Sequence, residues 1–223
     1  MPPPLEALET LPPEQRLAIA WSRAEARDRL ASMLAFDGRL ARIVTRTREP
    51  MLGQMRLAWW RDTLGLRVAA RPRGDVVLEA LGTFWEGREA GLIALVDGWE
   101  QVLHEKPLSE DAAGRFAEGR SAALLGVYGG DPRSDRPGAA SRRAAWCWSL
   151  GDFAARVSDP GERAMLAKLG LARSGPDRRL PRSERGLAVL GSLGERALRR
   201  GGRPLMEGRG AAMAVMRAAI FGG

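Results

Sequence analysis

The amino-acid sequence predicts an all-α protein, a single-domain bundle of nine or ten helices. Apolar residues recur at intervals of three and four along most of the chain, which is the spacing of one helix face. Residues that favour helix starts, such as Ser, Asp and Pro, precede many of these stretches. β-branched residues are scarce, and we find no run of alternating apolar and polar residues that would indicate a strand.

The helices are expected in close succession. The first begins after Thr10, where Pro12 and Pro13 suit a first turn, and continues to about residue 34. The second covers about 33–47, and the pattern leaves open whether the two are continuous. We expect the other helices at about 50–68, 75–86, 90–104, 109–128, 139–157, 158–170, from Ser183 onward, and at 204–220.

Two helix starts and one loop are the clearest boundaries. Ser109, followed by Glu110 and Asp111, is a typical cap with acidic residues in the first turn. Ser158-Asp159-Pro160 is a second strong start. The stretch GGDPRSDRPG at 129–138 is a loop that could divide two lobes. The connections elsewhere are short, which favours a single domain that spans residues 1–223.

The helix after Pro50 has two neighbouring apolar stripes. Leu52, Met55 and Trp59 form one, and Trp60 and Leu64 form the other. A helix that is apolar over most of its circumference is usually buried on more than one side. We therefore expect a central helix with its tryptophans in the core.

Charged residues interrupt those stripes. Arg56, Arg61 and Asp62 lie between them, and Arg56 and Asp62 are candidates to line a cavity or bind an anion. The plainer expectation is that Arg61 and Asp62 pair with Arg56 or with a neighbouring helix. The single cysteine, Cys147, lies between two tryptophans and reads as a small buried hydrophobic residue.

Composition points to a protein of a reducing compartment. With one cysteine the chain has no internal disulfide. No run approaches the roughly 18 apolar residues that cross a bilayer, and the start MPPPLEALET lacks the basic and apolar regions of a signal peptide. We expect a cytoplasmic protein, with peripheral contact to the inner membrane as an option.

The formal net charge is +8, and most of the excess lies in residues 173–217, with eleven arginines against four acidic residues. No aromatic residue lies among these arginines, so platforms for base stacking are missing. The charge therefore argues against nucleic acid and favours an anionic membrane surface or an acidic partner protein.

The stretch MLAFDGRLARIVTRTREPMLGQMRLAWWRDTL at 33–64 resembles the squalene/phytoene synthase family. It is most similar to the branch that contains the mitochondrial complex I assembly factor. The block REPMLGQMRLAWWRD is the specific part. Weaker similarity continues through LIALVDGWEQVL, AEGRSAALLGVYG, LPRSERGLAVL and GRGAAMAVMRAAIFG. The resemblance implies the isoprenoid synthase type of helical fold.

Active members of this family join two prenyl diphosphates, and Mg²⁺ ions on two aspartate-rich motifs stabilise the departing diphosphate. When Ala35-Phe36 is placed on the start of the first motif, its three aspartate positions fall at Ala41, Arg42 and Thr45. All three carboxylates are absent. Asp37 is the only acid in residues 33–48, so no shift of the alignment restores a pair.

The second motif is also degenerate. Its best candidate is Asp152, whose partner four residues later is Arg156, and such a pair is an ion pair rather than a magnesium site. The chain is also shorter than active members, and the missing length falls around and after this segment. The resemblance therefore implies no metal.

One interpretation of the arginines in the segment 33–48 is that they bind an anion without a metal ion. Arg39, Arg42 and Arg46 could face an anion such as a lipid diphosphate or a phospholipid headgroup. The plainer alternative is a solvated helix face that includes Ala41 and Thr45. Likewise, the apolar residues around Trp59 could line a prenyl tunnel instead of a core.

We therefore expect a catalytically degenerate pseudoenzyme that acts as a binding or assembly factor. The resemblance suggests a part in respiratory complex biogenesis, with a partner protein or an isoprenoid-like lipid as ligand. The alternative is an active prenyltransferase of the squalene/phytoene type that needs Mg²⁺ and uses non-standard residues.

Overall fold

The computed structural model describes residues 11–47, 49–103, 107–129, 138–173 and 179–222. Within these residues the protein has ten α-helices and no strand, which confirms the predicted all-α class and helix number. The helices are α2 (Pro13–Trp21), α3 (Ala24–Arg46), α4 (Pro50–Gly65), α5 (Val76–Phe84), α6 (Glu89–Gln101), α7 (Glu110–Tyr128), α8 (Ala139–Ala154), α9 (Pro160–Ala172), α10 (Arg185–Arg199) and α11 (Gly210–Phe221). Two 3-10 turns, Val68–Ala70 and Arg182–Glu184, lie between them.

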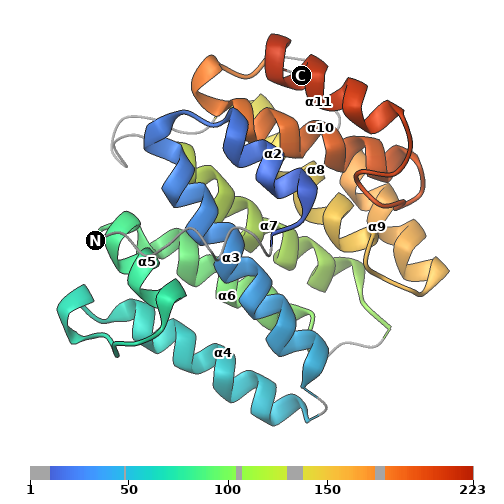
Figure 1. Ribbon diagram of the computed structural model, residues 1–223. Coiled ribbons are helices and arrows are strands. Elements are labelled where there is room, and N and C mark those ends of the chain that lie inside the picture. Colours follow the sequence, from blue (N-terminus) through green and yellow to red (C-terminus); the bar gives the residue numbers. More distant parts are fainter. Residues whose placement is uncertain (1–10, 48, 104–106, 130–137, 174–178, 223) are drawn as a thin grey trace.

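Six helices pack side by side as a row, in the order α4, α6, α7, α8, α10 and α11. Figure 1 shows α4 at the lower end of this row and α11 at its upper end. Helix α3 packs across α6 and α7 and also contacts α2, α4 and α5, whereas α2 lies on α10 and α9 on α8. Because α4 and α11 end the row, each has one side that carries exposed apolar side chains.

The helices of the row approach one another closely where glycines face each other. A Cβ atom on Gly119 of α7 would lie 2.1 Å from the carbonyl oxygen of Ala94 on α6. A Cβ atom on Gly194 of α10 would lie 2.5 Å from the carbonyl oxygen of Cys147 on α8. Both pairs of backbones are therefore too close for any larger residue at these positions.

Several predicted boundaries are confirmed. The Ser109 side chain accepts a hydrogen bond from the Ala112 amide at 3.1 Å, and Asp159 accepts one from Glu162 at 2.7 Å. Cys147 is buried, as expected. The predicted loop at 129–138 lies almost wholly outside the described residues, so the lobe division there stays a prediction. In the described part of the chain, no helix combines the length and apolar character needed to cross a membrane.

Two boundaries were predicted wrongly. The break between the first two helices lies at Ser22 and Arg23 rather than near residue 33, and α3 runs unbroken from Ala24. Ser22 turns its hydroxyl back to the Ala18 carbonyl, at 2.8 Å, which satisfies an acceptor at the end of α2. The last helix begins at Gly210 rather than 204, because Gly208 has a positive φ of 77° that interrupts helical geometry.

The prediction that the helix after Pro50 is central was also wrong. The inner side of α4, with Leu57, Trp60 and Leu64, is buried. The stripe of Leu52, Met55 and Trp59 points away from the bundle and is exposed. The sequence correctly indicated two apolar faces, but the described chain covers only one of them.

Candidate functional site

A buried cluster of charged side chains joins α3, α7 and α8. Arg120 of α7 donates from Nη2 to Asp37 Oδ2 and to Asp152 Oδ2, at 2.6 Å each. Its Nε donates to Asp37 Oδ1 at 3.0 Å. The three side chains are only 2–4% exposed, so one guanidinium links two carboxylates in the interior.

The remaining hydrogen-bonding groups of this cluster find partners around it. Trp99 Nε1 donates to Asp37 Oδ1 at 2.8 Å, and Arg120 Nη1 donates to the Ser149 carbonyl at 3.1 Å. Arg156 Nη2 donates to Asp152 Oδ1 at 2.9 Å, which confirms the predicted pair. Two carboxylates thus meet two guanidiniums, and their formal charges cancel.

Aromatic rings surround the central guanidinium. The Arg120 carbon Cζ lies 4.0 Å from the centre of the Trp148 ring, and 5.7 and 5.9 Å from the centres of the Phe116 and Trp99 rings. These ring faces attract a cation and shield it from water. The charges of the cluster therefore interact in a medium of low polarity, where each ion pair is strong and an unpaired charge is costly.

The protonation states follow from this arrangement. Burial alone would raise the pKa of Asp152, but the positive charges of Arg120 and Arg156 outweigh burial and hold that pKa below its ordinary value. Burial alone would lower the pKa of Arg120, and the two carboxylates raise it instead. Asp152 is therefore ionised, and Arg120 protonated, throughout the neutral range.

A pocket of about 330 Å³ opens beside the cluster, between α2, α3, α5 and the segment that follows α8. Its charged lining residues are Asp37, Arg39, Arg42 and Arg156. Gln15, which is 3% exposed, also lines it, and within the described residues its Oε1 has no hydrogen-bond partner. Arg39, another lining residue, has no partner for its Nε in the same part of the chain, so the pocket offers cationic groups and two unpaired polar atoms to a small polar ligand.

The pocket brings together some of the predicted residues and leaves others outside. Arg39 lines it but also pairs with Asp75 at 2.8 Å, whereas Arg42 lines it with no ion pair among the described residues. Arg46, one turn beyond, is exposed outside the lining. The other two aligned motif positions, Ala41 and Thr45, do not line the pocket and bond to each other, Thr45 Oγ1 donating to the Ala41 carbonyl at 2.8 Å.

The predicted residues on α4 lie apart from this site. Arg56 is exposed, with Nη1 3.5 Å from Thr47 Oγ1, and Asp62 is exposed. Arg61 pairs with Asp97 at 2.7 Å and with Glu100, both on α6, which confirms the expected pairing with a neighbouring helix.

Sequence reasoning missed the centre of the site. Asp37 was noted only as the lone acid of its segment, and Arg120 was not singled out. The segment AEGRSAALLGVYG contains one cation, Arg120, and one acid, Glu118, among residues that are otherwise mostly small or apolar. Such a cation on a buried helix needs buried acidic partners, and this requirement could have identified the pair with Asp37.

Both carboxylates of the cluster bond to a guanidinium. Among the described residues, no three His, Cys, Asp or Glu side chains are grouped so that they could hold an ion. Asp37 lies on α3 and Asp152 on α8, and the Arg120 guanidinium lies between their carboxylates.

Compared with protein-family models, curated proteins and solved structures, the chain has no match. The resemblance to the squalene/phytoene synthase family therefore stays a prediction from its sequence motifs.

Proposed function

We propose that this chain is a squalene/phytoene synthase-like protein that acts by binding rather than by prenyl transfer. The observation that supports this best is the position of Arg120, which bonds to both Asp37 and Asp152 at 2.6 Å. In a catalytic member, carboxylates on facing helices would hold Mg²⁺. In this chain a guanidinium supplies the positive charge between them.

The exchange of Arg120 for a metal ion is unfavourable in energetic terms. A Mg²⁺ ion that took these carboxylates would leave the Arg120 cation buried without a partner. Breaking a buried ion pair in this way costs about 3–5 kcal/mol. Mg²⁺ also prefers an octahedral shell of oxygen ligands, and two carboxylates provide few of them.

The pocket beside the cluster supports a binding role. Its volume of about 330 Å³ is at the lower end of ligand pockets, which suits one anionic headgroup rather than two prenyl chains. Arg42 and Arg156 can donate to phosphate oxygens without a metal ion, and the Gln15 amide can bond to a phosphate hydroxyl. We infer a small phosphate or diphosphate headgroup as the ligand.

Catalysis is tested with purified protein, farnesyl or geranylgeranyl diphosphate, and Mg²⁺. The proposal predicts no metal-dependent release of diphosphate, while an active head-to-head synthase in the same assay releases it. Release that requires Mg²⁺ and disappears in the Asp152→Asn variant would overturn the proposal.

Binding is tested by calorimetric titration of diphosphate and farnesyl diphosphate in the presence of a metal chelator. We expect binding that the Arg42→Gln variant weakens by about tenfold, since an arginine–phosphate contact is charge-assisted. Arg46→Gln is the matched control, because Arg46 lies one turn further along α3 outside the pocket lining. Equal losses in both variants would argue against the pocket.

One observation favours the alternative, an active prenyltransferase. Asp37 and Asp152 converge from α3 and α8, as two motifs that face each other across a cavity would. This alternative requires Arg120 to leave both carboxylates when substrate and metal arrive. Metal-dependent diphosphate release in the assay above separates the two functions.

The same resemblance extends the proposal to the assembly of a respiratory complex. In cells that lack this protein, we expect less assembled NADH dehydrogenase complex at unchanged levels of its subunit transcripts. Rescue by the Asp152→Asn variant, checked to be folded and present at normal amounts, would show that metal chemistry is not required.

A further inference from the structure

Helix α4 has a second apolar face that the described protein does not cover. Met51, Leu52, Met55 and Trp59 are exposed by 72%, 44%, 63% and 45%. Met51 and Leu52 lie about one turn before Met55, and Trp59 lies one turn after it, so the four form a continuous stripe on the side opposite the buried residues. Exposed single apolar residues are common, but a contiguous stripe of four large ones indicates an interaction surface.

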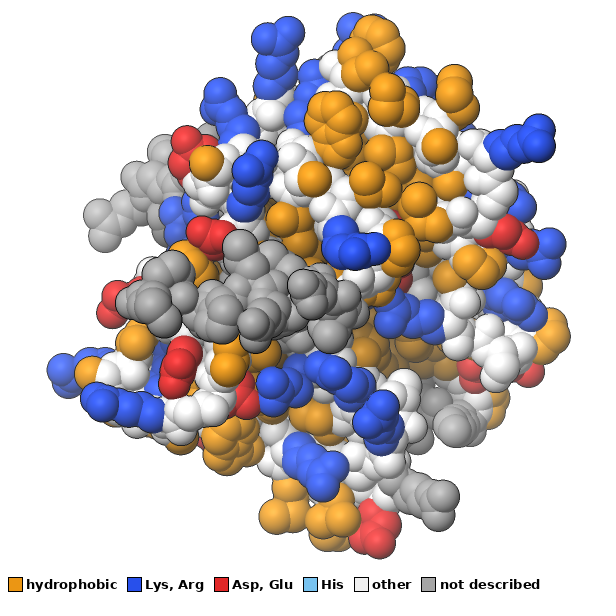
Figure 2. All heavy atoms as spheres, viewed as in Figure 1, with side chains coloured by type: hydrophobic (Ala, Val, Ile, Leu, Met, Phe, Trp, Pro, Cys, Tyr) orange, Lys and Arg blue, Asp and Glu red, His pale blue; other side chains and the backbone are white. Residues whose placement is uncertain are grey.

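Basic side chains border this stripe. Arg56 lies four residues after Leu52 and three before Trp59, which makes it their neighbour on the helix surface. Its Nη1 reaches Thr47 Oγ1 at 3.5 Å, so it lies beside the end of α3, where Arg46 is exposed. Figure 2 shows basic side chains gathered where α3 ends and α4 begins, with apolar side chains at the lower edge.

Exposed arginines outnumber exposed acids along α4 and its flanks. The exposed arginines are Arg46 at the end of α3, Arg56 on α4 and Arg67 after its C-cap, and the exposed acids on α4 and its N-cap are Asp62 and Glu49. Arg46 and Arg67 have no ion pair among the described residues, and the weak contact of Arg56 is with a neutral hydroxyl. Their charges remain available to a partner.

We propose that the outer face of α4 docks on a membrane surface rich in anionic phospholipids. The side chains of Met51, Leu52, Met55 and Trp59 enter the boundary between headgroups and acyl chains, and the arginines bind phosphate groups. This combination of an apolar stripe, a tryptophan and flanking arginines is the chemistry that holds amphipathic helices at anionic interfaces. An acidic protein that covers the same face is the alternative, and it predicts that the protein does not bind anionic vesicles.

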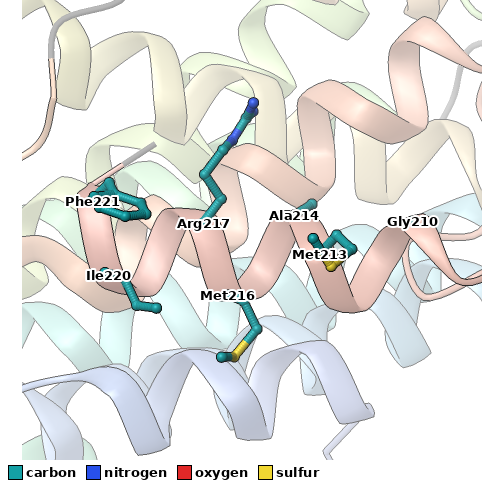
Figure 3. A pocket seen from close by; sticks show the side chains of 7 residues that line it. All are labelled: Gly210, Met213, Ala214, Met216, Arg217, Ile220 and Phe221. Carbon is teal, nitrogen blue, oxygen red and sulfur yellow. The ribbon is translucent and has the colours of Figure 1, made fainter.

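The outer face of α11, at the other end of the row, provides an internal control. Met213, Met216, Ile220 and Phe221 are exposed by 72%, 50%, 49% and 54%, along a hollow of about 550 Å³, so this face matches the α4 stripe in large apolar side chains and differs in charge. Met216 and Ile220 extend to one side of α11 and Arg217, its only charged residue, extends to the other (Figure 3). Because α4 and α11 lie at opposite ends of the row, a flat surface that contacts one does not contact the other (Figure 1).

The first test is co-sedimentation with vesicles of phosphatidylcholine alone or with about a third of phosphatidylglycerol. We expect binding to the anionic vesicles that falls as salt rises, and little binding to the neutral ones. The double substitution Met51→Ser/Met55→Ser should weaken binding about tenfold. Met213→Ser/Met216→Ser, which changes the same residue type at similar exposure on α11, should leave it unchanged.

The charge requirement is tested by a second matched pair. Arg46→Gln/Arg56→Gln should weaken binding to anionic vesicles about tenfold, whereas Arg209→Gln/Arg217→Gln on α11 should not. These substitutions leave the phosphate pocket intact, so membrane docking and headgroup binding can fail independently. All variants must keep the helical circular dichroism and melting temperature of the original protein.

Depth of insertion is measured by quenching of tryptophan fluorescence with brominated lipids. Trp59 and Trp21 are similarly exposed, by 45% and 40%, but only Trp59 lies on the α4 face. Trp59→Phe should remove the quenching and Trp21→Phe should retain it. The proposal is overturned if the protein ignores anionic vesicles, if it prefers neutral ones, or if the α11 variants and not the α4 variants lose binding.

Discussion

Asp37 on α3 and Asp152 on α8 accept hydrogen bonds from the same nitrogen atom, Nη2 of Arg120, each at 2.6 Å. A single cation therefore neutralises part of two buried carboxylates and fixes three helices relative to one another. The predicted aspartate-rich motifs contain few acidic residues, yet Asp37 and Asp152 lie together in the interior because both bond to Arg120. It also defines the most direct tests of stability.

Removal of Arg120 should strongly destabilise the fold. Arg120→Gln leaves two carboxylates buried without their cation, and we expect the free energy of unfolding to fall by about 3–5 kcal/mol in urea denaturation. The triple variant Asp37→Asn/Arg120→Gln/Asp152→Asn should recover part of this loss, because no unpaired charge remains. A triple variant less stable than the single one would contradict the electrostatic explanation.

The ionisation of Asp152 predicts a specific response to acid. The folded protein holds its pKa below the ordinary value, so Asp152 contributes stability that is complete above its unfolded pKa of about 3.9. This stability is lost as the pH falls below about 4 through the folded pKa. Carbon NMR of the Asp152 carboxyl group should show it ionised at pH 4, and a midpoint at or above 4 would refute the assignment.

The helical pattern made the fold class and most helix boundaries predictable, because caps such as Ser109 and Asp159 act within one turn of the chain. The Asp152–Arg156 pair was predictable for the same reason, since its members are four residues apart in sequence at the end of α8. The contacts of Arg120 were not, because Asp37 and Asp152 belong to helices distant in sequence. The periodicity of the sequence indicates on which face of its own helix a residue lies. It does not indicate which other helix that face contacts.

The outer face of α4 illustrates a second limit. The sequence correctly indicated two apolar stripes on this helix, but the prediction that both are buried was wrong. Burial of Trp60 and exposure of Trp59 depend on the number of helices around α4, which the local pattern does not contain. Here α4 ends a row.

Glu14 should be a site of stabilising substitution. Burial raises the pKa of its carboxyl group, and the nearby Asp152 raises it further, so the charged form is disfavoured in the folded protein. Glu14→Gln should therefore raise the melting temperature at pH 7, where Glu14 is charged in the unfolded chain. The gain should vanish near pH 3, and a gain that persists there would point to packing instead.

Cys147 should be chemically inert in the native protein. Burial raises the pKa of its thiol to about 11, and the nearby Glu195 adds to this, so little reactive thiolate exists at neutral pH. Labelling with iodoacetamide at pH 7.5 should be very slow until urea unfolds the chain. Complete labelling of the folded protein within minutes would show that the thiol is accessible.

Two glycines of α7 offer a matched test of helix packing. Gly119→Ala would place a Cβ atom 2.1 Å from the Ala94 carbonyl, and we expect a loss of about 1–3 kcal/mol in unfolding free energy. Gly114 has no neighbouring atom within 4 Å of such a position, so Gly114→Ala should stabilise the helix by up to about 1 kcal/mol. Equal effects would show that α6 and α7 are not in close contact.

The central claim is that Arg120, rather than a divalent metal ion, neutralises Asp37 and Asp152. It is tested most directly by titrating the folded protein with Mn²⁺ as a paramagnetic substitute for Mg²⁺. Electron paramagnetic resonance reports the free ion, and we predict that addition of the protein does not reduce the signal of millimolar Mn²⁺. One or more Mn²⁺ ions bound per chain, displaced by Mg²⁺ and lost in a folded Asp152→Asn variant, would contradict the account.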